Sequence, residues 1–292
     1  MNLDVVWEYL KEKREREEIE KLDQMVVVPD SFKSMEYVLT HRFVNSSSAF
    51  IGKDQNGNKL HVKVCSVPSF DDVKSIHKNL KLVSDCQIDL QLVPVIEIIE
   101  FFEGSRWVVL LISPYLEGFT LEELSEALHL HGFYLDKNTG ISVFLSILDI
   151  IKVADSKAAF IISTMPDNVF FISNTIESHG IISTETASYA LKILATSRQW
   201  LFCGRSRIEK LYPSSQKRNH VDGMIWGAGL CLYGLVSSQA LSTLPALNEI
   251  NDTERGELLK FHFEDEALSY IIKHSLKNTK PPSFTSHPYI KL

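Results

Sequence analysis

The chain has 292 residues, of which 45% are hydrophobic and 23% charged, and its formal net charge is -7. These proportions predict a globular protein with a substantial core, arranged as one large domain or two small ones. The negative charge argues against a protein that binds nucleic acid by neutralising phosphates.

The cysteines and the first residues bear on the compartment. The four cysteines are far apart and show no CxxC spacing: Cys65, Cys86, Cys203 and Cys231. We interpret them as reduced thiols of an intracellular protein, cytoplasmic and/or nuclear, and expect no metal site. No apolar run approaches the length of a membrane span, and the first eight residues lack the basic start and long apolar stretch of a signal peptide. A membrane partner is therefore not expected.

Residues 1–28 are expected to form a separate N-terminal region with one amphipathic helix. Leu3, Val6, Trp7 and Leu10 follow the i, i+3, i+4, i+7 spacing of a single apolar face, and residues 11–20 carry dense charges of mixed sign. The favoured interpretation is a solvated helix that caps the domain. The alternative is a helix that docks on a partner and uses Trp7 as its anchor.

The next region predicts an antiparallel sheet followed by a helix. Strands are expected at residues 35–43, 48–53 and 60–64, with Asn56-Gly57 as a strong hairpin signal before the third. Ser69, Asp71 and Asp72 suit the start of a helix over residues 68–84. Two more strands are expected at residues 92–100 and 106–112, joined by a turn at 103–105.

Helices dominate the expected second half. Thr120 and Glu123 have the spacing of a capping box, which predicts a helix start. A buried helix is predicted from a set of apolar positions: Ile141, Phe144, Leu145, Leu148 and Ile151. Residues 166–168 predict a turn before a short strand, residues 190–194 predict another strand, and residues 225–233 predict a glycine-rich helix packed tightly against its neighbours.

The segment Pro166-Asp167-Asn168-Val169-Phe170-Phe171 resembles the end of the protein-kinase catalytic loop, H-R-D-L-K-P-x-N. Other motifs of that family stand before and after this segment in the family's order. They are the strand lysine Lys63, the hinge at 113–118, the helix motif from Trp226 to Tyr233, and His287-Pro288 near the end. The resemblance implies an α+β, bilobal protein-kinase-like fold over residues 29–292. It would have a small antiparallel β lobe with one helix (about 29–113), a hinge (113–119) and a mainly helical large lobe (120–292).

The chemical positions of this family pattern are degenerate. On alignment, Ser163 replaces the catalytic aspartate, Met165 the loop lysine and Ala195 the aspartate of D-F-G. Asn79 replaces the helix glutamate, and residues 42–47 contain no glycine where a phosphate-binding loop belongs. Phosphoryl transfer needs a carboxylate at the attacking hydroxyl, a cation and held metal ions. The resemblance therefore implies a pseudokinase without catalytic residues and not an enzyme.

Three positions retain residues that contact nucleotide in active kinases: Lys63, the backbone amide of Leu116 in the hinge, and Asn168. No cofactor is expected, although these residues leave weak, metal-independent ATP binding open. Met224 stands where the family carries an acid that anchors the catalytic loop. Weaker anchoring of that loop is therefore expected.

The expected function is that of a protein-binding adaptor or allosteric regulator. The expected partner is a protein, and an active protein kinase is one candidate. The stretch Ile112-Ser113-Pro114-Tyr115 resembles the hinge of STRAD-type adaptor pseudokinases. Two alternatives remain: an atypical serine/threonine kinase that recruits Asp155, Asp167 or Glu177, and a purely structural subunit.

Candidate partner contacts are Trp7, the polar insert at residues 173–188, and Trp200 with Phe202, whose composition suits an interface hot spot. The alternative for Trp200 and Phe202 is that they fold into the empty nucleotide cleft or the core.

Overall fold

The structure is a computed structural model of the chain. It describes residues 4–22, 38–42, 49–84, 92–93, 95–115, 119–156, 164–171, 192–194, 211, 221–247, 249–260 and 265–276. The strands are β1 (Val38–Arg42), β2 (Ala49–Lys53), β3 (Lys59–Val67), β4 (Leu92–Val93), β5 (Glu97–Glu103), β6 (Arg106–Pro114), β7 (Phe119–Thr120), β8 (Val169–Phe171) and β9 (Lys192–Leu194). The helices are α1 (Asp4–Leu22), α2 (Phe70–Ser84), α4 (Leu121–Leu130), α5 (Lys137–Ser156), α7 (Val221–Val236), the short 3-10 helix η3 (Leu241–Thr243), α8 (Asp252–Lys260) and α9 (Glu266–Ser275).

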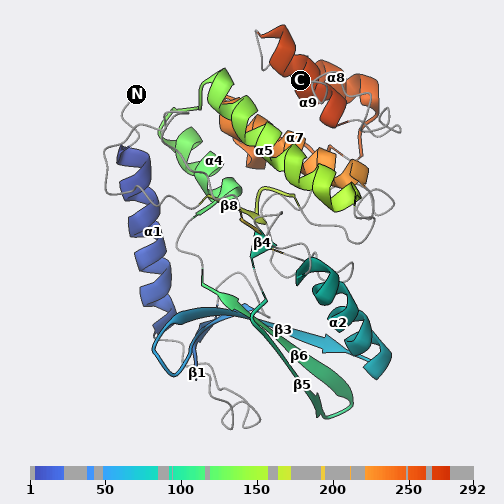
Figure 1. The fold of residues 1–292 in the computed structure, drawn as a ribbon. Coiled ribbons are helices and arrows are strands. Elements are labelled where there is room, and N and C mark those ends of the chain that lie inside the picture. Colours follow the sequence, from blue (N-terminus) through green and yellow to red (C-terminus); the bar gives the residue numbers. More distant parts are fainter. Residues whose placement is uncertain are drawn as a thin grey trace.

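The α+β class is confirmed. Five strands form an antiparallel sheet in the order β1-β2-β3-β6-β5, and α2 lies against it (Figure 1). The turn between β2 and β3 closes where the sequence predicts it. Asp54 accepts hydrogen bonds from the backbone of Asn56 and Asn58, and Gly57 takes a φ of 81° that suits glycine.

Both faces of this sheet are buried at its centre. Leu60 and Val62 of β3 belong to an apolar cluster on one face, together with Val108, Leu110 and Ile112 of β6. On the opposite face, Cys65 and Val67 pack with three residues of α2: Val73, Ile76 and Leu80. Alternation along a strand produces this division, because successive side chains point to opposite faces.

Helices α4, α5 and α9 and the short helix η3 contact α7, which belongs to the largest apolar cluster of the described residues (Figure 1). Every residue of α7 from Gly223 to Val236 is buried. A small second sheet, in the order β4-β9-β8-β7, lies between these helices and the five-stranded sheet, and its β4–β9 pair is parallel. None of the described helices is both long and apolar enough to cross a membrane.

Helix α1 contributes to the same apolar cluster as α7. Val6 and Leu10 are buried, and the Trp7 ring lies 6.0 Å from the Phe119 ring, centroid to centroid. The helix contacts β1 and α4, so it spans from the five-stranded sheet to the helical part (Figure 1). The apolar spacing read from the sequence thus corresponds to a face that is buried within this chain.

Two expectations from the sequence are corrected. Residues 92–100 do not form one strand: β4 joins the small second sheet and β5 joins the large one. Pro94 stands between them in the sequence and has no backbone N–H to donate to a sheet.

On α5, Leu145 is 37% exposed while Ile147 is fully buried. The buried stripe follows positions 140, 143, 144, 147, 148 and 151, and Leu145 lies about 100° away from Phe144 around the helix.

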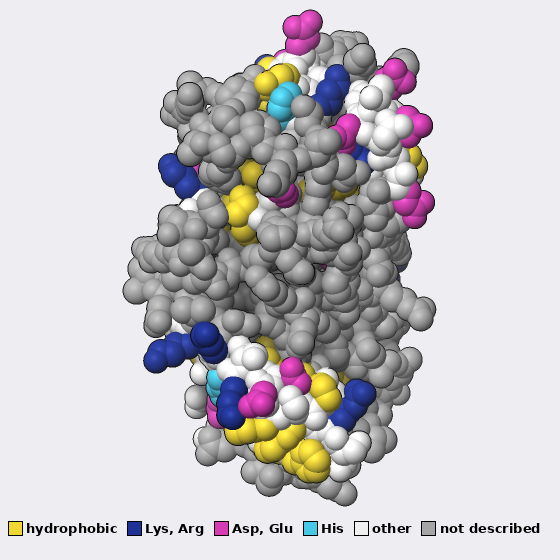
Figure 2. Space-filling view, turned by 90° about the vertical axis from the view of Figure 1, so that its right-hand side faces the viewer, with side chains coloured by type: hydrophobic (Ala, Val, Ile, Leu, Met, Phe, Trp, Pro, Cys, Tyr) yellow, Lys and Arg dark blue, Asp and Glu magenta, His cyan; other side chains and the backbone are white. Residues whose placement is uncertain are grey.

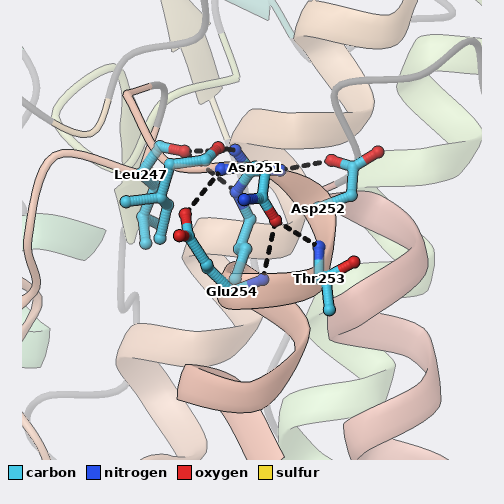
Figure 3. Close-up of polar contacts among 7 residues, drawn as sticks. Leu247, Asn251, Asp252, Thr253 and Glu254 are labelled. Carbon is cyan, nitrogen blue, oxygen red and sulfur yellow. Dashed lines mark hydrogen bonds and ion pairs between the residues drawn. The ribbon is translucent and has the colours of Figure 1, made fainter.

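The start of α8 holds a buried arginine. Asn251 caps the helix by accepting from the backbone N–H groups of Thr253 and Glu254, and the Glu254 carboxylate accepts from the Asn251 N–H (Figure 3). Arg255, 2% exposed, donates to the carbonyls of Leu247 and Ile250 and to the Asp252 carboxylate, and its guanidinium lies 5.0 Å from the centre of the Trp226 ring. The buried charge is thereby paired, as burial requires.

Candidate functional site

The candidate site is centred on the turn that precedes β8. The N–H of Asn168 donates to the carbonyl of Met165 at 2.8 Å, which closes the turn predicted at residues 166–168. The carbonyl of Pro166 accepts from the N–H of Glu122 at 3.1 Å, one of the amides at the start of α4 that have no partner within the helix. The capping box of Thr120 and Glu123 fixes that helix start. The loop is therefore held by backbone contacts on its α4 side.

A second set of contacts holds the loop on α7. The Thr164 hydroxyl donates to the carbonyl of Met224 at 2.5 Å, and the Cys231 thiol donates to the carbonyl of Thr164 at 3.4 Å. Gly227 lies so close that an added Cβ would come within 2.7 Å of the Thr164 carbonyl carbon. The loop is thus attached to α7 although Met224 offers no carboxylate, because the backbone of Met224 makes the contact.

The side chains of the loop from Thr164 to Asn168 are buried or half-buried. Met165 is 4% exposed and belongs to the apolar cluster around α7. Asp167 and Asn168 are half-buried, and the Asn168 amide donates to the Asp167 carboxylate at 3.2 Å. Burial, together with the nearby Asp167 charge, raises the pKa of the Cys231 thiol well above its usual value. Cys231 is therefore a neutral hydrogen-bond donor and not a nucleophilic thiolate.

Lys63 lies on β3, opposite Ala49 of β2 and Leu111 of β6, and is half-buried. His61 stands two residues earlier and so shares its face of the sheet. Burial of the imidazole and the charge of Lys63 lower the pKa of His61 to about 4. The His61 ring is therefore neutral at neutral pH.

The end of β6 corresponds to the start of the predicted hinge. Pro114 lies opposite Leu60, and the N–H of Tyr115 donates to the carbonyl of Lys59 at 3.2 Å. The Lys59 ammonium lies 5.4 Å from the centre of the Tyr115 ring. The segment between β6 and β7 therefore leaves the sheet from a fixed point beside β3.

Several residues singled out from the sequence lie outside the described part of the chain. They are Ser163, Ala195, Leu116, Trp200, Phe202 and Glu177, the insert at 173–188, the loop at 43–47 and the C-terminal residues 280–290. Asn79 lies on α2 and Asp155 on α5, but their side chains are outside it too. Within the described residues no group of three or more His, Cys, Asp or Glu side chains could hold a metal ion.

Sequence reasoning did not find the residues that fix the loop. A threonine and a cysteine in apolar surroundings, as at positions 164 and 231, give no signal of their own. Gly227 did give one, because a glycine inside a buried helix indicates a close approach of another segment.

No protein-family model matches the chain, and a search of curated proteins finds no similar sequence.

Proposed function

We propose that this chain is a pseudokinase: a bilobal protein-kinase-like fold that transfers no phosphate and acts by binding another protein. Support comes from the order of the elements. A five-stranded antiparallel sheet carries one helix after its third strand, a chain segment leads from β6 into α4 and α5, and a turn-and-strand loop rests on the buried helix α7. The family implied by the sequence motifs uses this order of elements.

The observation that carries the proposal is the loop at residues 164–168. Its backbone is fixed on α4 and α7, so the loop has a defined shape. Met165, at the position where a kinase would present a lysine, is buried in the apolar core and cannot supply a cation to a phosphate. A loop whose backbone contacts to α4 and α7 are kept, and which has an apolar side chain where a kinase has its lysine, fits a structural role.

An intracellular protein partner, with an active protein kinase as the first candidate, completes the proposal. Cys65 and Cys231 are both buried, and buried cysteines that stay reduced fit a reducing compartment. Kinase adaptors act by binding one conformation of their partner more tightly than another. The full chain used as bait should therefore retain a protein that is stoichiometric with it, and a bait that retains none at matched expression would count against the adaptor role.

A nucleotide experiment tests the degenerate site directly. A ligand that binds only the folded state raises the melting temperature, by an amount that grows with its concentration. Because Met165 is buried and Ser163 and Ala195 replace two aspartates, millimolar Mg-ATP should leave the Tm unchanged within about 1 °C. A magnesium-dependent rise that disappears in Lys63→Ala would contradict the proposal, and Lys53→Ala, on the neighbouring strand, serves as the matched control.

A further inference from the structure

An exposed aromatic cluster lies where the start of α2 meets the β5–β6 hairpin. The Phe70 and Trp107 rings are 4.8 Å apart and the Phe102 and Trp107 rings 5.5 Å apart, centroid to centroid. Phe70 is 42% exposed and Phe102 58% exposed. Single exposed apolar residues are ordinary on protein surfaces, but a contiguous group of aromatic rings marks a site of interaction.

Rigid elements hold these rings in place. Phe102 and Trp107 lie directly opposite each other on β5 and β6, next to the pair Glu103–Arg106 that closes the hairpin. Phe70 opens α2, whose preceding residue Ser69 exchanges hydrogen bonds with Asp72. A surface that is already ordered loses little conformational entropy when a partner binds.

A basic stripe continues from this cluster along α2. Lys74, Lys78 and Lys81 are exposed and follow Phe70 at spacings of four, four and three residues, which keeps them on one side of the helix. Lys81 is about 16 Å from Phe70 along the helix axis. Lys74 pairs with Asp71 at 3.0 Å and also lies 5.1 Å from the centre of the Phe70 ring, so it joins the aromatic cluster to the stripe.

The lysines of the stripe are opposite in sign to the net charge of the chain, and the acids of α2, Asp71 and Asp72, lie at its Phe70 end. His77 of α2 contacts Glu100 of β5 at 2.8 Å, Nε2 to Oε2. In the described part of the chain no acid pairs with Lys78 or Lys81. Figure 2 shows hydrophobic side chains gathered at the lower end of this face, with basic, histidine and acidic side chains directly above them. Among the described residues, the surface thus combines an apolar end with an end that carries Lys78 and Lys81.

We propose that the aromatic cluster and the basic stripe together bind an acidic segment of a partner protein. An apolar anchor residue of that segment would pack on Phe70, Phe102 and Trp107, and its carboxylates would follow Lys78 and Lys81. This inference rests on the proposed protein-binding function and specifies the chemistry of the partner. Aromatic anchors provide the affinity of such contacts, and charge complementarity provides their orientation and selectivity.

Two other occupants fit the surface less well. A second copy of the chain, packed on this surface by a two-fold axis, would bring the same lysines of the two copies into one interface, where like charges repel. An anionic membrane is held by clusters of roughly four to eight basic residues. Here three lysines are accompanied by Asp71, Asp72 and Glu100 on the same elements.

The test is an unbiased selection of displayed random peptides of roughly 12 residues, long enough to span the stripe, on the immobilised full chain. Enriched peptides should carry net negative charge and at least one Phe, Leu or Trp. The best peptide, synthesised with a fluorescent label, should bind at least about tenfold more weakly to Phe102→Ser and to the double variant Lys78→Glu/Lys81→Glu, and more weakly as salt is raised. Leu130→Ser, at a site 62% exposed on α4, and Lys152→Glu, on α5, should bind as wild type does.

Several other results would overturn the proposal. Enriched peptides without acidic bias, or peptides that bind both test variants as tightly as wild type, would overturn the proposal. So would a wild-type dimer in analytical ultracentrifugation that Phe102→Ser dissociates, or Phe102-dependent binding to phosphatidylserine vesicles. Peptide binding that is lost only in Trp7→Ala would place the partner site on α1; this would overturn the present inference and leave the proposed function standing. Phosphotransfer activity of the chain would contradict the proposed function itself.

Discussion

At the scale of single residues, two glycines within helices have opposite surroundings. A methyl group at Gly227 would meet the hydroxyl, the carbonyl carbon and the carbonyl oxygen of Thr164 at 2.6 to 2.8 Å, whereas nothing lies within 4 Å of the corresponding position at Gly256. Alanine is the better helix former by about 1 kcal/mol. The sign of each substitution therefore depends on the space around it.

We predict that Gly227→Ala lowers the free energy of unfolding by about 2 kcal/mol, because the loop must move away from α7. Gly256→Ala should raise it by about 0.5 to 1 kcal/mol, since only the helix propensity changes. Urea denaturation followed by circular dichroism measures both values. Equal effects from the two substitutions would mean that the loop does not rest on Gly227.

His61 makes stability depend on pH. Its pKa in the folded state is about 4, below the ordinary value of 6.5, so between these values the unfolded chain binds a proton that the folded chain does not. Unfolding is therefore favoured as pH falls, and the stability present above pH 6.5 is lost progressively towards pH 4.

In His61→Gln the decline in Tm between pH 6.5 and 4 should be shallower than in wild type. Because the imidazole retains some exposed surface, water screens part of the cost, and the difference is about 1 to 2 kcal/mol at pH 4. Thermal denaturation across this range measures it. Above pH 7 the two profiles should run parallel; parallel profiles down to pH 4 would show that His61 is not responsible.

At the scale of elements, α1 is the clearest case of a helix fixed by one buried face. Val6 is 1% exposed within the apolar cluster around α7, while its neighbour Val5 is 44% exposed. Val6→Ala should cost about 2 kcal/mol by removing buried methyl groups and leaving a cavity, and Val5→Ala less than about 0.5 kcal/mol. Chemical denaturation of the two variants makes the comparison. A neutral Val6→Ala would mean that α1 does not pack on the helical part of the chain.

Local signals in the sequence predicted most elements because the causes of those elements are local. Asn56-Gly57 requires a turn, Thr120 and Glu123 cap α4 as predicted, and the glycine-rich stretch from Trp226 forms a buried helix. The strand division at Pro94 and the exposure of Leu145 depend on which sheet or neighbour each residue meets. Contacts of that kind, distant in sequence, are not encoded in periodicity.

The sequence predicted the elements of the candidate site but not the hydrogen bonds that join them. The turn before β8 and the burial of α7 follow from residue types, but the bonds from Thr164 and Cys231 join segments that lie 60 and 67 residues apart. The aromatic cluster was not predicted either. It assembles Phe70 from a helix start with Phe102 and Trp107 from a hairpin, and only the fold brings them together.

At the scale of the whole molecule, the central claim is that this chain transfers no phosphate. The backbone contacts of the loop at 164–168 are present and Met165 is buried, and the proposed kinase alignment puts Ser163 and Ala195 where catalysis would need aspartate. The most direct measurement is the transfer of labelled phosphate from Mg-ATP to generic protein substrates and to the chain itself. We predict no transfer above that of heat-denatured protein. Transfer by the native chain that disappears in Lys63→Ala or Asn168→Ala, and persists in Lys152→Ala, would contradict it.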